Sequence, residues 1–401
     1  MNITFVNTEY LLVPPIRGGA VEEWIDKIAH HLKGHQVSVF SYDEQRKRSS
    51  EKKEHIRYFW YKPGFLGRLL LSTYRLPFKK DDSKWFYFPY SWWCAKKLSN
   101  IKPDIIHIHN RPHFVWMIRK NNPKAKIILH LHQVSTMEEE NFWTKEFIES
   151  VDLFVGCSQF IADEIIKRYS VPKSKTAVFY NALDIDQFPL LSQEKERRET
   201  LRRESQNADK KVILYVGRLV ENKGVHYAIE AVRNLVLKGF TDIKLIVCGA
   251  RGYANREVTS YIQKLYNIAY EVNENIFFAG FVSYEKILDY YLMSDLVVIP
   301  SEVPEGFCLI TIESMAVGVP VLASHRGGMP EIVQNGKTGV IVEEPSVASF
   351  ERHIHEFLEH PNRFSKYSLA GRRMVEEKFT WDKVNQKVEK TYQELMNHAQ
   401  S

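Results

Sequence analysis

The stretch Asp-Leu-Val-Val-Ile-Pro-Ser-Glu-Val-Pro-Glu-Gly-Phe-Cys-Leu-Ile-Thr-Ile-Glu, residues 295–313, places two glutamates after a short apolar run. Residues 296–300 are typical of a buried strand, and residues 309–312 are typical of the start of a helix. A strand that ends in a loop and leads into a helix marks the edge where open α/β sheets bind nucleotides. Glu305 lies in the predicted loop, and Glu313 lies about two helical turns further on, at ~1.5 Å rise per residue. The pair therefore suits the two ends of an elongated, polyhydroxylated ligand such as a nucleotide sugar.

Similar apolar runs, rich in valine and isoleucine, alternate with helical patterns along the whole chain. They cover residues 3–6, 37–40, 105–109, 127–131 and 153–157, then 212–216, 245–248, 276–279, 296–300 and 319–323. Short, continuous apolar strands between helices indicate parallel sheets that are covered on both faces. Residues 152–158 repeat the Asp, the apolar strand and the Ser of residues 295–301, which favours two halves built alike.

A charged segment at residues 192–211 separates the two sets of strands and contains few apolar residues. We interpret this segment as a domain boundary that consists of a linker and a surface helix. We therefore predict the α/β class, with two Rossmann-like domains whose parallel sheets face a central cleft that holds the ligand. The predicted domains are residues 1–190 and residues 191–379, and residues 380–401 form a helix that returns to the first domain.

The composition fits this organisation. A chain of 401 residues with 44% hydrophobic content is long enough for two cores, at roughly 100–200 residues per domain. The net charge of +6 is compatible with an anionic ligand but selects no partner. The four cysteines are scattered without metal-type spacing, which indicates free thiols in a reducing cytoplasm. No apolar run reaches the ~20 residues of a membrane helix and no signal peptide precedes residues 3–6, so we expect a cytoplasmic protein with at most peripheral membrane contact.

Two glycine-containing junctions are candidates for binding phosphate. Gly217-Arg218 leaves a predicted strand, and Lys223 precedes a predicted helix a few residues later. Glycine lets the backbone approach an anion, a helix start attracts it, and two cations add charge. A surface loop with two solvated cations is the alternative. Gly18-Gly19 stands at the first strand–helix junction, where an ordinary turn is equally compatible.

Four histidines alternate along two predicted strands, His107 with His109 and His130 with His132. Alternation places each pair on one face of its strand. Histidines within strands are commonly packed core residues. A metal site is the alternative, but no acidic or cysteine residue has ligand-like spacing, so we predict no metal. His132 lies nearest a strand end and is the candidate that faces a substrate.

Three further segments permit two interpretations each. Residues 327–331, Gly-Gly-Met-Pro-Glu, are either a close-approach turn or a turn with a helix-capping acid. The aromatic run at residues 85–93 is expected in the core, with carbohydrate stacking or membrane-interface contact as the alternative. The cation-rich residues 46–80 are expected on a solvated face, with an anionic acceptor or a lipid headgroup as the alternative. Nucleic acid is not expected, because no known binding module is recognisable.

Taken together, these motifs resemble the retaining glycosyltransferases of family 4, which have the GT-B architecture. The resemblance runs along nearly the whole chain and is densest at residues 212–342. Its most specific parts are the two glutamates at 305 and 313, the Gly-Arg-Leu…Lys-Gly element at 217–224 and the Gly-Gly-Met-Pro-Glu element at 327–331. Residues 181–188, 280–283 and 289–295 are also similar to the family, and residues 107–112 resemble its spore-coat-associated bacterial branch.

The resemblance implies a role for each candidate residue. Arg218 and Lys223 would bind the diphosphate, Glu313 the ribose and Glu305 the donor sugar, and His132 would face the reacting side of that sugar. The catalytic candidates are thus His132, Arg218, Lys223 and Glu305. The other donor-binding candidates are Gly18, Gly19, Gly217, Phe281 beside the base, Glu313, and the backbone of Gly306, Phe307, Cys308 and Leu309. The family often has glycine where Cys308 and Ala182 stand, so backbone approach at Cys308 is expected to differ.

The implied reaction moves a hexose from a nucleotide diphosphate sugar to an acceptor hydroxyl by same-face attack, with retention. Neither a metal nor a cofactor is needed, because the cations stabilise the leaving group. A uridine diphosphate sugar is the first choice on family frequency, and the acceptor is a carbohydrate, a lipid-linked group or a small molecule. A nucleotide-sugar epimerase and a non-catalytic coat or scaffold protein are the alternatives. The sequence does not specify the base, the hexose, the acceptor, the oligomeric state or the pathway, and spore association is a further option for its location.

Overall fold

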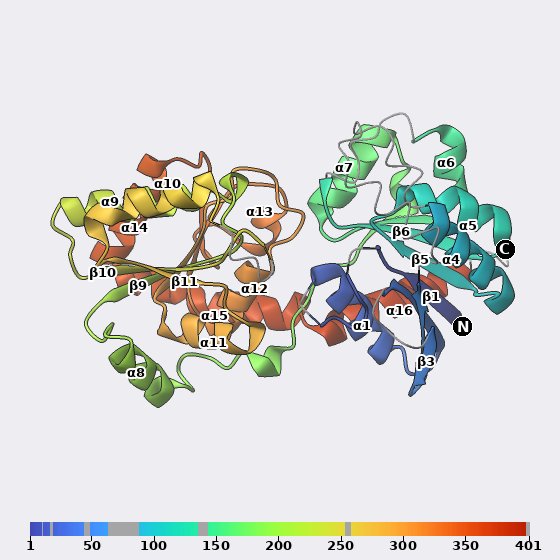
Figure 1. Ribbon diagram of the computed structural model, residues 1–401, viewed down its shortest axis with the longest axis horizontal. Coiled ribbons are helices and arrows are strands. Elements are labelled where there is room, and N and C mark those ends of the chain that lie inside the picture. The colour runs from blue at the N-terminus through green and yellow to red at the C-terminus, as the bar shows by residue number, and fades with distance from the viewer. Residues whose placement is uncertain are drawn as a thin grey trace. The chain divides into compact units, whose positions relative to one another are not determined.

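The computed structural model describes residues 1–9, 11–16, 19–43, 49–62, 88–134, 143–252 and 258–397. Gly18, residues 46–48 and 63–80 of the cation-rich segment, and residues 85–87 of the aromatic run lie outside these ranges. The chain forms two compact units, Met1–Asn181 with Trp381–Ser401 and Ala182–Thr380. Each unit is an open α/β sheet with helices on both faces (Figure 1). The predicted pair of Rossmann-like α/β domains is therefore confirmed.

Unit 1, as we call Met1–Asn181 with Trp381–Ser401, contains an eight-stranded sheet in the order β3-β4-β2-β1-β5-β6-β7-β8. The strands are β1 Asn2–Val6, β2 Gln36–Tyr42, β3 Ser50–Lys53, β4 Ile56–Tyr61, β5 Ile105–His109, β6 Lys126–Leu131, β7 Leu153–Gly156 and β8 Thr176–Val178. The helices are α1 Ala20–His31, α4 Phe88–Ile101, α5 Val115–Asn121, α6 Lys145–Ser150, α7 Gln159–Tyr169 and α16 Trp381–Asn397, with short 3₁₀ helices at Pro112–Phe114 and Lys173–Lys175. All neighbouring strands are parallel except β3 and β4.

Side chains of the central strands pack against helices on both faces of the sheet. Phe5 of β1 packs edge-on against Trp24 of α1, at 6.2 Å between ring centroids. Phe40 of β2 packs against Trp93 of α4, at 5.3 Å. Because Phe5 pairs in register with Val39 and not with Phe40, the two phenylalanines point to opposite faces. The sheet is thus covered on one face by α1 and on the other by α4.

Helix α16 belongs to unit 1 although it follows the whole of unit 2 in the chain. Its buried residues Trp381, Val384, Val388 and Tyr392 recur at intervals of three or four, which places them on one helical face. This face packs beside α1, and the Tyr392 hydroxyl reaches His107 Nδ1 at 2.5 Å. A helix from the C-terminal end therefore completes the core of the N-terminal unit.

The strands β3 and β4 lie where the sequence predicted only a solvated, cation-rich face. They form an antiparallel pair at the edge of the sheet, with Lys53 opposite Ile56. Residues Ser50–Lys53 are mostly exposed, so their sequence resembles a surface segment. Lysines are common on such edge strands, because they discourage pairing with another strand. In β4, the buried residues Tyr58 and Trp60 alternate with more exposed ones. This alternation was therefore a strand signal in the sequence of residues 56–61.

Unit 2, as we call Ala182–Thr380, contains a six-stranded parallel sheet in the order β11-β10-β9-β12-β13-β14. The strands are β9 Lys211–Val216, β10 Ile243–Cys248, β11 Ile276–Gly280, β12 Leu296–Ile299, β13 Val321–Ser324 and β14 Val340–Val342. The helices are α8 Lys195–Glu204, α9 Val225–Leu237, α10 Ser260–Ala269, α11 Tyr284–Met293, α12 Leu309–Val317, α13 Met329–Ile332, α14 Val347–Glu359 and α15 Pro361–Lys378, with 3₁₀ helices at Ile185–Gln187, Glu221–Lys223 and Tyr270–Val272. Figure 1 shows α9, α10 and α14 on one face of this sheet and α11, α12 and α15 on the other.

The segment predicted as a boundary, residues 192–211, contains helix α8, which is part of unit 2. Arg198 and Arg202 of α8 form ion pairs with Asp295 at 2.5 and 3.0 Å. The compact units divide after Asn181 and after Thr380, whereas the sequence placed the divisions after residues 190 and 379. Arg198 also donates to the Ser294 carbonyl oxygen at 2.8 Å, so the expected surface helix is anchored to unit 2 by ion pairs and by hydrogen bonds.

The repeated Asp before a strand has the same structural role in both units. Asp295 Oδ2 accepts a hydrogen bond from the Val212 backbone N–H at 2.8 Å, at the start of β9. Asp152 Oδ2 accepts one from the Ile127 N–H at 2.8 Å, at the start of β6. Each carboxylate thereby satisfies a backbone donor that the first residues of a strand leave free. No helix in the described part of the chain is long and apolar enough to cross a membrane.

Candidate functional site

Glu305 lies in the loop between β12 and α12 and is held by side chains from two segments. Its Oε1 accepts a hydrogen bond from Lys223 Nζ at 2.5 Å and another from Ser301 Oγ at 2.7 Å. Lys223 ends the 3₁₀ helix that follows β9, and the two charged side chains are only 24% and 14% exposed. The structure therefore brings together two of the predicted catalytic residues as a partly buried ion pair.

Glycines 224 and 327 fix the backbone around this pair. Gly224 has φ +63°, and a Cβ atom there would lie 1.9 Å from the Pro300 carbonyl oxygen at the end of β12. Gly327 has φ +62°, and its Cβ atom would lie 2.2 Å from the Glu305 carbonyl oxygen. That oxygen accepts a hydrogen bond from the Gly328 N–H at 2.8 Å. The Gly-Gly-Met-Pro-Glu motif is thus a close-approach turn that supports the loop of Glu305.

Helix α12 begins directly after this loop, at Leu309, with Cys308 as its N-cap residue and no side-chain cap. The first N–H groups of such a helix are available to an anion. Burial and, to a smaller extent, the Glu305 carboxylate raise the pKa of the Cys308 thiol to about 11, while Lys223 opposes the shift. Glu305 precedes the first residue of α12 by four positions in the chain. Phe307 packs edge-on against Phe379 at 5.6 Å, and Gly306 stays in the loop.

Glu313 projects from α12 toward α11. Its Oε2 accepts a hydrogen bond from the hydroxyl of Tyr291 at 2.7 Å. Tyr291 is fully buried, and burial together with the charge of Glu313 raises its pKa well above the usual value. The hydroxyl therefore stays protonated and keeps donating, so it fixes one oxygen of the half-buried Glu313 carboxylate.

A cavity of about 230 Å³ lies at the carboxyl ends of β9, β10 and β11. It is lined by, among others, Gly217, Arg218, Cys248, Gly249, Phe281 and Ile287. This volume is below the 300–1,000 Å³ typical of pockets for whole drug-sized ligands, so it suits one ring of a larger ligand. The predicted residues Gly217, Arg218 and Phe281 thus share one pocket, at the sheet edge where open α/β folds bind nucleotides.

The buried Tyr215 connects the pocket with the loop of Glu305. Its hydroxyl donates to the Arg218 carbonyl oxygen at 3.0 Å. Burial raises its pKa well above the usual value, the Glu305 charge adds to this, and Arg218 opposes it, so both groups lie near this hydroxyl. Arg218 is exposed and, within the described ranges, forms no ion pair with a carboxylate. Its guanidinium is therefore available to an anionic ligand, whereas Lys223 is already shared with Glu305.

The remaining candidates belong to unit 1. His132 follows β6, and its Nε2 lies 3.1 Å from His109 Nδ1. Its backbone N–H donates to Asn110 Oδ1 at 2.8 Å, and burial lowers the pKa of its ring to about 3, so the ring is neutral. Gly19 is the N-cap residue of α1 with φ +129°, and a Cβ atom there would lie 2.3 Å from Glu22 Oε2. Gly19 therefore approaches a carboxylate of its own helix.

Two family models together match most of the chain. Residues 21–187 match Glycosyltransferase Family 4, and residues 196–374 match Glycosyl transferases group 1. The chain is a GT4-like glycosyltransferase. The family predicted from the motifs and the assignment as a transferase enzyme are confirmed.

This glycosyltransferase is similar to proteins of different described roles. It is 28% identical over 404 residues to spore coat protein SA of Bacillus subtilis (strain 168), covering 98% of this chain and 99% of that protein. It is 28% identical over 401 residues to the lipopolysaccharide 1,2-N-acetylglucosaminetransferase of Salmonella typhimurium, covering 96% and 97%. The crystal structure of Anabaena HepE in complex with UDP matches with a TM-score of 0.76 at 19% identity, over 98% of this chain and 100% of HepE, which shows a shared fold.

Sequence reasoning missed three partners in the glycosyltransferase. Tyr291 holds Glu313 from another helix, and Ser301 holds Glu305 within one loop. The sequence reveals neither the packing of the two helices nor the shape of the loop. Gly249 was also missed, although a glycine directly after a strand is a recognisable signal. A Cβ atom at Gly249 would lie 1.9 Å from the Gly217 carbonyl oxygen, so this glycine lets two strand ends of the pocket approach each other.

Proposed function

We propose that this glycosyltransferase moves a hexose from a nucleotide diphosphate sugar to an acceptor hydroxyl, with retention and without a divalent metal. The observation that carries the proposal is the ion pair of Lys223 with Glu305, at 2.5 Å, beside the uncapped start of α12. A lysine and a helix start favour phosphate, and a carboxylate favours sugar hydroxyls. Their meeting in one loop supports a ligand that carries both groups.

The diphosphate is assigned to Arg218, Lys223 and the first N–H groups of α12. Arg218 lines the pocket and has no carboxylate partner in the described part of the chain. Lys223 remains paired with Glu305 and contacts phosphate with its other N–H donors, since an ammonium group has three. Charges fixed in advance stabilise a leaving diphosphate without reorganisation, which supports a reaction that needs neither metal nor cofactor.

The nucleoside is assigned to the pocket and to Glu313. Phe281, 50% exposed at the pocket, offers a ring on which a base can stack. Glu313 is assigned to the ribose hydroxyls, because a carboxylate accepts hydrogen bonds and the Tyr291 hydroxyl orients this one. Uridine diphosphate is the preferred nucleotide, and this choice is supported by HepE, which has been solved with UDP and with UDP-glucose.

In the proposed step, the acceptor oxygen bonds to the anomeric carbon as the bond from that carbon to the diphosphate oxygen breaks. The acceptor proton passes to an oxygen of the departing diphosphate, so attack occurs on the same face. Glu305 orients the sugar, and neutral His132 is assigned to its reacting side as a hydrogen-bond partner. Neither glutamate serves as a second catalytic acid, since each is held by a donor from the protein.

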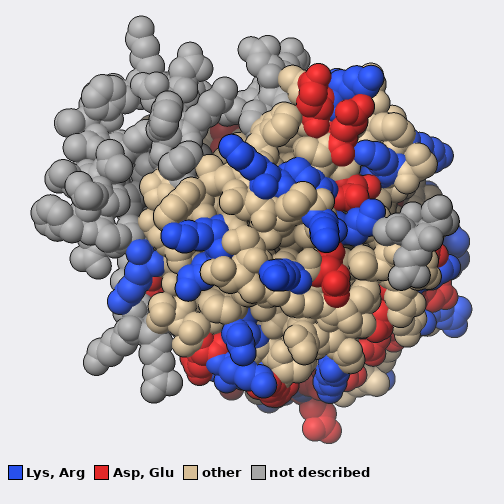
Figure 2. Space-filling model, turned by 90° about the vertical axis from the view of Figure 1, so that its right-hand side faces the viewer, with Lys and Arg blue, Asp and Glu red and all other residues tan. Residues whose placement is uncertain are grey.

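The acceptor is proposed to be a carbohydrate, lipid-linked or small-molecule hydroxyl, reached from the cytoplasm with peripheral membrane contact. Two exposed tryptophans on packed helices support that contact, Trp92 on α4 at 50% and Trp116 on α5 at 44%. Lys96 Nζ lies 5.1 Å from the Trp92 ring, so a cation accompanies the aromatic surface. Figure 2 shows lysine and arginine side chains spread over a face of unit 1, with uncharged residues between them.

The test is incubation of the full chain with UDP-glucose, UDP-N-acetylglucosamine and GDP-mannose, with and without sugar and glycolipid acceptors. We expect nucleotide release that depends on the acceptor, an unchanged anomeric configuration in the product by NMR, and equal rates with and without added Mg²⁺ or Mn²⁺. Isomerised sugar without an acceptor would instead identify an epimerase. A thermal melt unaffected by every nucleotide and nucleotide sugar would identify a scaffold protein, because a bound ligand raises stability.

A further inference from the structure

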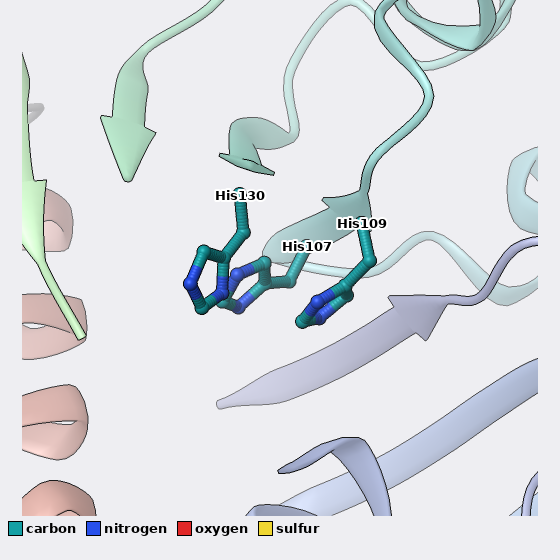
Figure 3. A group of neighbouring side chains, drawn as sticks. All are labelled: His107, His109 and His130. Carbon is teal, nitrogen blue, oxygen red and sulfur yellow. The ribbon is translucent and has the colours of Figure 1, made fainter. Parts of the chain in front are cut away.

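Three histidines of unit 1 meet on one side of its sheet. His107 and His109 are two positions apart on β5, and His109 pairs in register with His130 of the neighbouring parallel strand β6. Side chains in register or two positions apart share a face. One ring nitrogen from each of the three histidines lies within 4.8 Å of the others, and all three side chains are fully buried (Figure 3).

The outer nitrogens of two of these rings have hydrogen-bond partners. His107 Nδ1 lies 2.5 Å from the Tyr392 hydroxyl, and His109 Nδ1 lies 3.1 Å from His132 Nε2. When each Nδ1–H donates to its partner, the lone pair resides on Nε2. This is the arrangement by which neighbouring groups fix the tautomer and orientation of a metal-binding histidine.

The inner nitrogens lack such partners. Within the described residues, neither Nε2 of His107 nor Nε2 of His109 accepts a hydrogen bond. His130 likewise has a ring nitrogen without a hydrogen-bond partner. Buried polar atoms are normally paired, because an unpaired one costs stability. Aromatic or aliphatic side chains would fill the same volume without that cost. The three rings therefore keep unpaired nitrogens close to one another in the buried core of unit 1.

The surroundings suit an enclosed ion. The ring of Trp24 lies 5.3, 5.2 and 4.9 Å from the rings of His107, His109 and His130 and separates them from solvent on the side of α1. Zinc–nitrogen bonds of ~2.0–2.1 Å would place the three nitrogens about 3.3 Å apart, compared with present separations of up to 4.8 Å. Binding would therefore tilt the rings of His107 and His109, which now lie 15° from parallel with their centroids 4.5 Å apart. A water molecule would complete four ligands. No acidic or cysteine ligand is required, because three imidazoles are a known zinc donor set.

We propose that His107, His109 and His130 bind one divalent transition-metal ion, with zinc as the preferred ion, which stabilises unit 1. Imidazole nitrogen favours zinc over magnesium or calcium. The role is structural and independent of the transfer reaction, whose diphosphate is assigned to residues of unit 2. Ion binding and folding are coupled, because the three ligands come together only when β5 and β6 pair, and Tyr392 of α16 orients His107.

The test uses the full chain without a polyhistidine tag, purified after growth with added zinc and dialysed against metal-free buffer. Elemental analysis is expected to find about one zinc per chain, and added zinc is expected to raise the melting temperature of chelator-treated protein by several degrees. Cobalt substitution is expected to give the visible absorption of a four-coordinate site. His130→Ala and His109→Gln should each lose bound metal at least about tenfold and remove the zinc-dependent rise in melting temperature.

His55→Ala is the matched control, because His55 lies in the same unit but contacts the Ala29 carbonyl oxygen at 2.8 Å and is not part of the cluster. It should keep the zinc content and the rise in melting temperature. The glutamine variant retains a polar side chain of similar size, so it tests the ligand even where alanine prevents folding. Wild-type protein that retains under about a tenth of an equivalent of zinc, shows no shift with zinc and no cobalt absorption would overturn the proposal.

Discussion

Lys223 Nζ lies 2.5 Å from Glu305 Oε1, although 82 residues separate the two in the chain. The strand order brings them together, because β9 and β12 are neighbours in the sheet and each residue follows one of these strands. The pair joins a cation proposed for phosphate to a carboxylate proposed for sugar. Changing either residue should therefore affect both functions of the loop.

Replacement of both Arg218 and Lys223 by alanine should abolish transfer while the protein remains folded. Each preorganised cation is expected to contribute about 10²–10³ in kcat. Nucleotide release in the presence of acceptor measures activity, and circular dichroism measures folding. Lys264→Ala, an exposed lysine on α10, is the control and should retain full activity. Turnover near the wild-type rate in the double variant would contradict the proposed leaving-group role.

Gly327→Ala should destabilise unit 2 and weaken donor binding together. The added Cβ atom would lie 2.2 Å from the Glu305 carbonyl oxygen, and alanine at φ +62° is strained as well. We expect the free energy of unfolding to fall by about 2–4 kcal/mol in urea titrations. Gly336→Ala is the matched control, since Gly336 has φ +73° but no atom within 4 Å of its Cβ position, and it should cost only about 1–2 kcal/mol. Equal effects of the two variants would count against the close-approach role of Gly327.

Tyr291→Phe should raise the KM for the donor several-fold and leave kcat nearly unchanged. The hydroxyl fixes Glu313 Oε2 at 2.7 Å, and loss of a hydrogen bond to a charged group costs about 1.5–3 kcal/mol. Steady-state kinetics with varied donor separate the two constants. The neighbouring Tyr290→Phe should have little effect. A fall in kcat alone would place Glu313 in the chemical step and not in ribose binding.

The Cys308 thiol should react slowly with iodoacetamide in the native protein at pH 8. Its pKa of about 11 keeps the thiol protonated, and the thiolate is the reactive form. The rate should rise about tenfold per pH unit until the pH approaches that value. Because the folded pKa is above the ordinary one, burial stabilises the fold at low pH and this contribution is lost as pH rises from about 9 to 11. Peptide mapping by mass spectrometry follows the reaction, and urea-unfolded protein, which should react quickly at pH 8, serves as the reference.

Asp295→Asn should detach helix α8 from the rest of unit 2. Asp295 pairs with Arg198 and Arg202 and also accepts the Val212 N–H, and its side chain is 19% exposed. Removing the charge leaves two partly buried arginines with backbone carbonyl partners but without their carboxylate, for which we expect a loss of about 2–4 kcal/mol in urea titrations. Asp289→Asn, which breaks only the pair with Arg197 at 2.6 Å, should cost about 0–1 kcal/mol. Similar losses for both variants would mean that the anchoring of α8 rests on other contacts.

The central strands could be predicted from the sequence because strands buried on both faces are continuous runs of valine and isoleucine. Strands β9 and β12 were recognisable for this reason, whereas their position as neighbours in the sheet is seen only in the structure. Edge strand β3 was missed because it buries little. A surface helix was expected within residues 192–211, but its ion pairs with Asp295 were not, because contacts between residues distant in the chain leave no local pattern.

The candidate site was predictable residue by residue but not as a set of contacts. The alternation of His107 with His109 indicated a shared face, yet only the register of β5 with β6 brings His130 beside them. The turn at Gly327 could be expected from its sequence. Its contact with the Glu305 carbonyl could not, because it depends on a β-bridge between Glu305 and Gly327, which are 22 residues apart. Spacing along the chain reveals elements, and contacts between elements require the order of the strands.

The return of α16 to unit 1 makes that unit discontinuous in the chain, with Ala182–Thr380 inserted between its two parts. During synthesis, unit 2 is complete once Thr380 has left the ribosome. The core of unit 1 still lacks Tyr392, which is fully buried and contacts His107. Although domains usually fold in order from the N-terminus, here the unit that begins the chain is the last that can finish folding.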